Sequence, residues 1–122
     1  MTPTIKLIKL TTDGERIGLK CDADKSYEAL SQGVGGWIEC VRLTPTLDMW
    51  VNEEGKMNGL EYNPDATAVF WSHFGVMSDI IVGDVVFASH DDEGNTTSLS
   101  TEEIQYLEKY LNFDLEKNLN FI

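Results

Sequence analysis

Two histidines and two cysteines are the residues with the widest chemical range in this chain, and their spacing limits what they can do. His73 and His90 each lack a second histidine or a cysteine at metal-binding spacing. Cys21 and Cys40 form no C-x-x-C pattern, which argues against a zinc site and a thioredoxin-like motif. His90 precedes two aspartates, but neighbouring strand residues point to opposite faces. The sequence therefore predicts no metal and no cofactor, and it disfavours histidine-based catalysis.

Two short segments resemble parts of known ligand-binding loops. A phosphate-binding loop leads from a strand into a helix, whereas Gly33-Val34-Gly35-Gly36 follows a predicted helix and enters a predicted strand. Aligning 91–95 with a calcium loop puts Ser89 and Ser100 at its first and twelfth positions, where carboxylates are needed. No serine lies in a G-x-S-x-G elbow. We interpret the glycines as a helix cap and turn, and the acidic run as a solvated hairpin loop.

The charge balance excludes some partners and favours others. The chain has 21 acidic and 9 basic residues, with a formal net charge of -12. Nucleic-acid affinity depends on Lys and Arg that displace counterions from phosphates, so direct binding to DNA, RNA or an anionic membrane is disfavoured. The same charge favours encounter with basic protein surfaces. A role in maintaining solubility is the alternative explanation of the charge.

Aromatic and acidic residues supply the candidate partner surface. Large side chains gather where a predicted helix ends, and although most aromatic residues should lie in the core, some of these would remain exposed. Acidic residues of one loop and one helix start would extend that surface toward a basic partner. The full predicted partner surface is Trp71, His73, Phe74, Asp91, Asp92, Glu93, Glu102 and Glu103.

The hydrophobic pattern predicts the elements that position these residues. Strands are expected over 4–10, 16–21, 37–44 and 47–52, and a strand pair or a bulged strand interrupted at Gly83 is expected over 80–88. Helices are expected from 24 or 26 to 32, from Pro64 onward and from Ser100 onward.

Capping signals set the ends of these helices. Gly33 is predicted to close the first helix, with Tyr27 directed toward the core. Asn63 is predicted to cap the second helix, and Ser100-Thr101-Glu102-Glu103 reads as a capping box for the third. Gly55 is predicted to supply a positive φ to a tight turn.

We expect one α+β domain over residues 1–122. Its core should be a mixed, mostly antiparallel sheet of five or six strands with two or three helices packed on one face. No apolar run reaches the length of a membrane span, and the chain starts without the apolar stretch of a signal peptide. We therefore expect a cytoplasmic protein with free thiols. The apolar residues Leu115, Leu119, Phe121 and Ile122 either pack on their own domain or form a homodimer contact.

Five segments occur in a fixed order within residues 26–103. They are Tyr27-Glu28-Ala29-Leu30, Val34 to Glu39, Asn52 to Lys56 with Leu60, Asn63 and Ala66, Ile81 to Val85, and Asp92 to Gly94 before Leu99 and Ser100. Together they resemble a family of small proteins encoded by bacteriophages and mobile elements and catalogued as a domain of unknown function. The resemblance carries no catalytic residues. It implies a setting in which small acidic proteins often act by occupying a host protein.

These observations favour a non-enzymatic accessory protein with an anti-defence or host-takeover role. It would bind and inhibit or modulate a host protein with a basic, nucleic-acid-binding surface, its acidic residues imitating DNA. A small-ligand or nucleotide-signal binder with an aromatic pocket is the alternative, although Arg16 and Arg42 are the only arginines available for phosphates. A further alternative is a small enzyme that uses an acid such as Glu39 or Asp84 beside a histidine.

Overall fold

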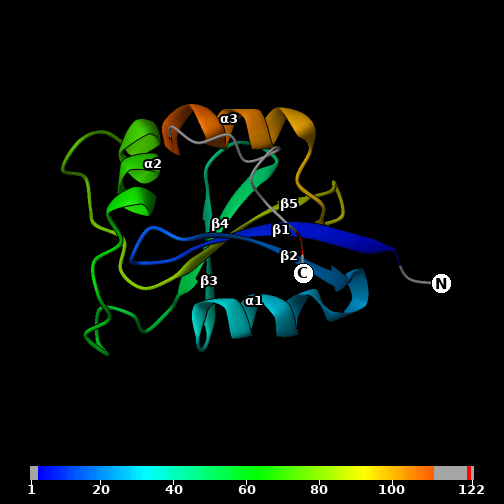
Figure 1. Ribbon diagram of the computed structural model, residues 1–122, viewed down its shortest axis with the longest axis horizontal. Helices are drawn as coiled ribbons and strands as arrows, with labels where there is room; N and C mark the ends of the chain where they lie inside the picture. Colours follow the sequence, from blue (N-terminus) through cyan, green and yellow to red (C-terminus); the bar gives the residue numbers. More distant parts are fainter. Residues whose placement is uncertain (1–2, 112–120, 122) are drawn as a thin grey trace.

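The computed structural model describes residues 3–111 and 121, and an antiparallel sheet forms its centre (Figure 1). Its strands are β1 (Thr4–Leu10), β2 (Arg16–Asp22), β3 (Ile38–Arg42), β4 (Leu47–Asn52), β5 (Val85–His90) and β6 (Thr96–Thr97). The strand order is β2-β1-β5-β4-β3, and the short β6 pairs with β5. All pairings between these strands are antiparallel. The predicted sheet of five or six strands is confirmed.

Three helices accompany the sheet: α1 (Ser26–Val34), which follows the short 3-10 helix η1 (Ala23–Lys25), α2 (Pro64–Phe74) and α3 (Thr101–Leu111). The α+β class is therefore confirmed. Figure 1 shows α1 below the sheet and α2 with α3 above it. Our expectation that the helices share one face is wrong, because the central strands carry apolar side chains on both faces.

β1 shows why both faces need cover. Ile5 and Leu7 belong to the core cluster under α1, whereas Ile8 and Leu10 belong to the cluster under α2 and α3. All four side chains are at most 5% exposed. Since successive strand side chains point to opposite faces, the break in alternation at Ile8 marks a strand that is buried on both sides.

The first helix ends later than predicted. Gly35, with a φ of 79°, closes α1, and its N–H donates to the carbonyl oxygen of Ser31 at 2.9 Å. Gly33 lies inside the helix, where an added Cβ would come within 2.5 Å of Val86. Its role is to let α1 approach β5 closely. Tyr27, expected in the core, is 54% exposed.

Two of the other local predictions are confirmed and one is wrong. Asn63 caps α2 by accepting the N–H of Ala66 at 3.0 Å. The capping box of α3 is complete, because the Ser100 N–H donates to the Glu103 carboxylate at 2.9 Å and the Glu103 N–H donates to the Ser100 hydroxyl at 3.1 Å. Gly55 has no positive φ and is buried against Val82, so the left-handed residue of this segment is Gly59.

The C-terminal tail is described at one residue. Phe121 forms a parallel bridge with Gly18 of β2 and packs against the core cluster under α2 and α3. This contact places Phe121 on its own domain. Leu115, Leu119 and Ile122 lie outside the described residues. Within the described part of the chain, no helix is long and apolar enough to cross a membrane.

Candidate functional site

The two segments that carry the acidic residues of the predicted partner surface, the β5–β6 loop and the start of α3, lie at one end of the sheet, on the right of Figure 1. Asp91, Asp92 and Glu93 form the loop between β5 and β6, and Glu102 and Glu103 begin α3.

Thr46 connects the two acidic segments. Its hydroxyl donates to the Glu103 carboxylate at 3.0 Å, and its carbonyl oxygen accepts the N–H of His90 at 3.1 Å. The loop that follows β5 and the start of α3 therefore meet on one short turn between β3 and β4.

The aromatic residues of the predicted surface lie elsewhere, on α2. The His73 ring bonds to the Tyr106 hydroxyl, and the two ring centroids are 5.3 Å apart. Trp71 donates its indole N–H to the carbonyl oxygen of Asp79. Phe74 remains 49% exposed beside Phe70. Trp71 and His73 thus hold α2 to its neighbours, and the structure does not join them to the acidic residues.

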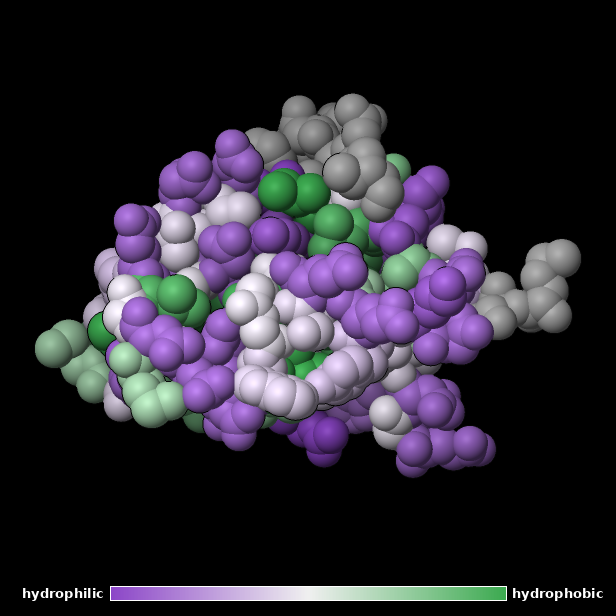
Figure 2. All heavy atoms as spheres, turned by 90° about the horizontal axis from the view of Figure 1, so that it is seen from below, coloured by the Kyte–Doolittle hydropathy of each residue, from purple (hydrophilic) through white to green (hydrophobic). Residues whose placement is uncertain are grey.

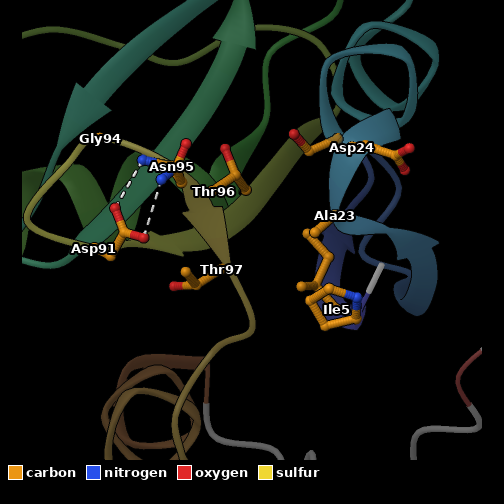
Figure 3. A pocket seen from close by; sticks show the side chains of 10 residues that line it. Ile5, Ala23, Asp24, Asp91, Gly94, Asn95, Thr96 and Thr97 are labelled. Carbon is orange, nitrogen blue, oxygen red and sulfur yellow. Dashed lines mark hydrogen bonds between the residues drawn. The ribbon is translucent and has the colours of Figure 1, made fainter. Parts of the chain in front are cut away.

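A pocket of about 530 Å³ opens beside Asp91 (Figure 3). Figure 3 shows Asp91 and Asn95 on one side, with Asp24, Ala23 and Ile5 on the other. The lining residues come from the N-terminal segment, η1, α1 and the β5–β6 hairpin: Pro3, Ile5, Ala23, Asp24, Ser26, Asp91, Gly94, Asn95, Thr96 and Thr97.

The polar side of this pocket is negatively charged. The Asp91 carboxylate accepts the N–H of Asn95 at 2.9 Å, the N–H of Glu93 at 3.0 Å and the side-chain amide of Asn95 at 3.2 Å. These hydrogen bonds hold the pKa of Asp91 below its usual value, and the bond from the Asn95 backbone N–H has the largest effect. Asp24 is an acidic residue on the opposite side of the pocket, and none of the ten lining residues is basic. The pocket therefore suits a cation better than a phosphate.

The pocket also has an apolar side, made by Pro3, Ile5 and Ala23. A lysine or arginine side chain has an apolar stem and a charged head, so it can use both sides of such a pocket. Figure 2 views the molecule from the α1 side and shows mainly hydrophilic and neutral atoms, with hydrophobic atoms in separate small areas. A partner on this face would make mainly polar contacts.

A histidine–aspartate pair lies on the face of the sheet that α1 covers. The sequence analysis did not predict it. His90 Nδ1 is 2.7 Å from Asp48 Oδ2, and the two side chains are 14% and 3% exposed. Asp48 pairs across the sheet with Ala88, which packs under α1, and His90 lies two residues further along the same face. The residues are 42 positions apart. The available signal was an acid inside the apolar strand 47–51.

The surroundings of Asp48 limit the chemistry of this pair. Arg42 Nε lies 3.8 Å from Asp48 Oδ1. Burial first, and the Asp48 charge second, raise the pKa of the Cys40 thiol to about 11. Cys40 is therefore protonated at neutral pH and is not an activated nucleophile. Neither Asp48 nor His90 lines the 530 Å³ pocket. Among the described residues, no group of three or more His, Cys, Asp or Glu is placed to hold a metal ion.

Comparison with known protein families shows which family the chain matches. The family described as "Domain of unknown function (DUF3846)" matches residues 6–112. The matched range contains the whole sheet from Lys6 onward and all three helices. No curated protein and no solved structure matches the chain.

Proposed function

Because the chain belongs to the DUF3846 family, a domain of unknown function, we propose its function from the geometry of the acidic end. The protein is a non-enzymatic accessory protein that binds a partner protein with a basic surface. The pocket beside Asp91 accepts a lysine or arginine side chain of that partner. The observation that carries this proposal is a pocket with two carboxylates, an apolar wall and no basic lining residue.

The contacts expected in such a complex follow from the pocket walls. The apolar stem of the incoming side chain packs against Ile5 and Ala23, and its charged head meets Asp24 and Asp91. Around the pocket, Asp92 is exposed and carries further negative charge. The net charge of -12 steers a basic partner toward the protein and raises the association rate.

The nature of the partner is part of the same proposal. The resemblance to proteins of bacteriophages and mobile elements points to a host protein in the cytoplasm of the host cell. A basic surface is the feature by which host proteins hold nucleic acid. Occupation of that surface by acidic residues excludes DNA or RNA and so inhibits or modulates the host protein.

The other hypotheses fit this geometry less well. A nucleotide signal would place phosphates next to Asp24 and Asp91, while the two arginines already form ion pairs, Arg16 with Asp65 and Arg42 with Asp48. For an enzyme, the Asp48–His90 pair is the group best suited to proton transfer. Since neither residue lines the pocket, we assign that pair a structural role.

The test uses a fluorescent oligo-lysine peptide as the basic probe and measures its binding by anisotropy. The double variant Asp24→Asn/Asp92→Asn removes one charge that lines the pocket and one charge from the residue next to Asp91. The matched control Glu53→Gln/Glu61→Gln removes two exposed charges from the segment between β4 and α2. We expect the pocket variant to weaken binding about fivefold, since each exposed ion pair contributes up to about 1 kcal/mol. The control should change binding less than about twofold.

Equal weakening by both variants would show that overall charge, and not the pocket, attracts the peptide. A second probe separates these outcomes further. The same peptide with acetylated lysines keeps its length but loses its positive charges, and it should not bind.

A further inference from the structure

The two edge strands of the sheet, β2 and β3, differ in what pairs with their outer sides. At the β2 edge, Phe121 bridges Gly18 in parallel orientation. At the β3 edge, no strand or bridge pairs with the outer side of β3 within residues 3–111 and 121. We infer that two copies of the chain join through β3 and form one continuous antiparallel sheet. This inference goes beyond the proposed function and does not depend on it.

The hydrogen bonds around β3 show which backbone groups are open. The Glu53 N–H donates to the Trp37 carbonyl oxygen at 2.8 Å, and the Leu43 N–H donates to the Leu47 carbonyl oxygen at 2.9 Å. Trp37 and Leu43 therefore direct their backbone groups toward β4, and by alternation Glu39 and Val41 do the same.

The residues between them have the opposite orientation. Ile38, Cys40 and Arg42 direct their N–H and C=O groups away from β4, toward the open edge. An edge of this kind is a template for a further strand.

A second copy fits this template in a symmetric register. A twofold axis perpendicular to the sheet keeps each side chain on the same face of the sheet in both copies. It also pairs residues whose backbone groups point to the open edge with residues of the same kind in the second copy. Centred on Cys40, it places Cys40 opposite Cys40 of the second copy and Ile38 opposite Arg42 of the second copy. Glu39 then faces Val41. All five residues of β3 pair, and no two like charges face each other.

Trp37 supports the same pairing independently. Trp37 immediately precedes β3, and its side chain is 63% exposed. In the register above it lies opposite Leu43 of the second copy, in a pair without hydrogen bonds, where Cα atoms approach to about 4.5 Å. The indole, which contacts solvent in one copy, would be covered in the dimer. Large aromatic residues are enriched at such contacts.

The chemistry of the centre is compatible with two copies. Since its thiol is protonated at neutral pH, Cys40 brings no charge to the axis. The paired Cα atoms of a hydrogen-bonded site lie about 5.5 Å apart, which is within the range of a disulfide. None of the residues that line the pocket beside Asp91 belongs to β3, so the dimer leaves that pocket open.

The net charge of -12 on each copy opposes association. Salt screens this repulsion over about 8 Å at physiological ionic strength, whereas short backbone hydrogen bonds are affected less. Sedimentation velocity of the reduced full chain, over a concentration series, should therefore give twice the mass of one copy, 13.7 kDa. The dimer fraction should rise with salt.

Covalent trapping tests the register. Diamide accepts two electrons and two protons from two thiols, which leaves one disulfide between the copies. We expect a covalent dimer in the natural chain and in Cys21→Ser, whose altered residue lies on β2, and none in Cys40→Ser.

Cys40→Pro removes the outward N–H while leaving the bonds to β4 intact, so it should abolish the noncovalent dimer and preserve the far-ultraviolet circular dichroism spectrum. A chain that remains monomeric at all concentrations and salt levels overturns the inference. So does a dimer that persists in folded Cys40→Pro, or a disulfide formed through Cys21.

Discussion

His90 Nδ1 lies 2.7 Å from Asp48 Oδ2, and this contact joins the last residue of β5 to the second residue of β4. Asp48 is 3% exposed and His90 is 14% exposed, so the contact is largely withdrawn from water. A buried carboxylate needs such a partner, because leaving it unpaired costs several kcal/mol. The pair stabilises the end of the sheet at which the acidic loop begins.

Substitution of Asp48 tests the structural role of this pair. Asp48→Asn keeps the size of the side chain but removes its charge, and it should lower the free energy of unfolding by about 2 kcal/mol. Urea denaturation measures this change. Asp92→Asn, at an exposed position, should change it by less than about 0.5 kcal/mol. An Asp48→Asn variant as stable as the natural chain would show that the pair contributes nothing.

The Cys40 thiol gives a prediction about pH. Its folded pKa of about 11 lies above the usual 9.0, so the folded state favours the protonated thiol. The stabilisation is complete below pH 9 and is lost as pH rises through 11. Alkylation by iodoacetamide, measured in Cys21→Ser at concentrations where the chain is monomeric, should therefore accelerate until about pH 11.

Neighbouring charges provide the controls for that profile. Asp48 raises the pKa of Cys40 and Arg42 lowers it. Asp48→Asn should move the alkylation profile to lower pH, and Arg42→Ala should move it to higher pH. Profiles that do not move in these directions would contradict the assigned cause.

Gly33 gives a prediction about packing between α1 and β5. Gly33→Ala would place a methyl group 2.5 Å from Val86 Cγ2 and should cost about 1–3 kcal/mol. Adding Val86→Ala creates space for this methyl group, so the double variant should be less destabilised than the sum of the two single variants. Thermal denaturation of all four proteins measures the coupling. Strict additivity would mean that the clash is relieved by movement of the whole helix.

The start of α3 gives a prediction about capping. Ser100→Ala removes the acceptor of the Glu103 N–H and should lower the free energy of unfolding by about 1 kcal/mol. Glu103→Gln retains a side chain able to accept the Ser100 N–H, so it should cost less. Chemical denaturation of the two variants distinguishes these effects, and equal losses would argue against the reciprocal cap.

Local features of the fold could be predicted from the sequence because they depend on near neighbours. The strands of the first hairpin follow from alternating apolar residues around a glycine turn. The caps at Asn63 and Ser100 follow from side chains that bond to the next turn of backbone. The acidity of the loop after β5 is a matter of composition. These features required no knowledge of how distant segments meet.

The candidate site depended on contacts between distant segments. The pocket wall joins residues 3–26 to residues 91–97, and the histidine pair joins positions 42 residues apart. The strand order places β6 beside β5 and β5 beside β1. The cross-strand register places His90 next to Asp48. The sequence by itself determined the elements, their caps and the acidic charge, since these are local. Only the tertiary structure decided which face of the sheet each helix covers, where the pocket lies and that the β3 edge is open. These features depend on strand pairing and burial, which join residues far apart in the sequence.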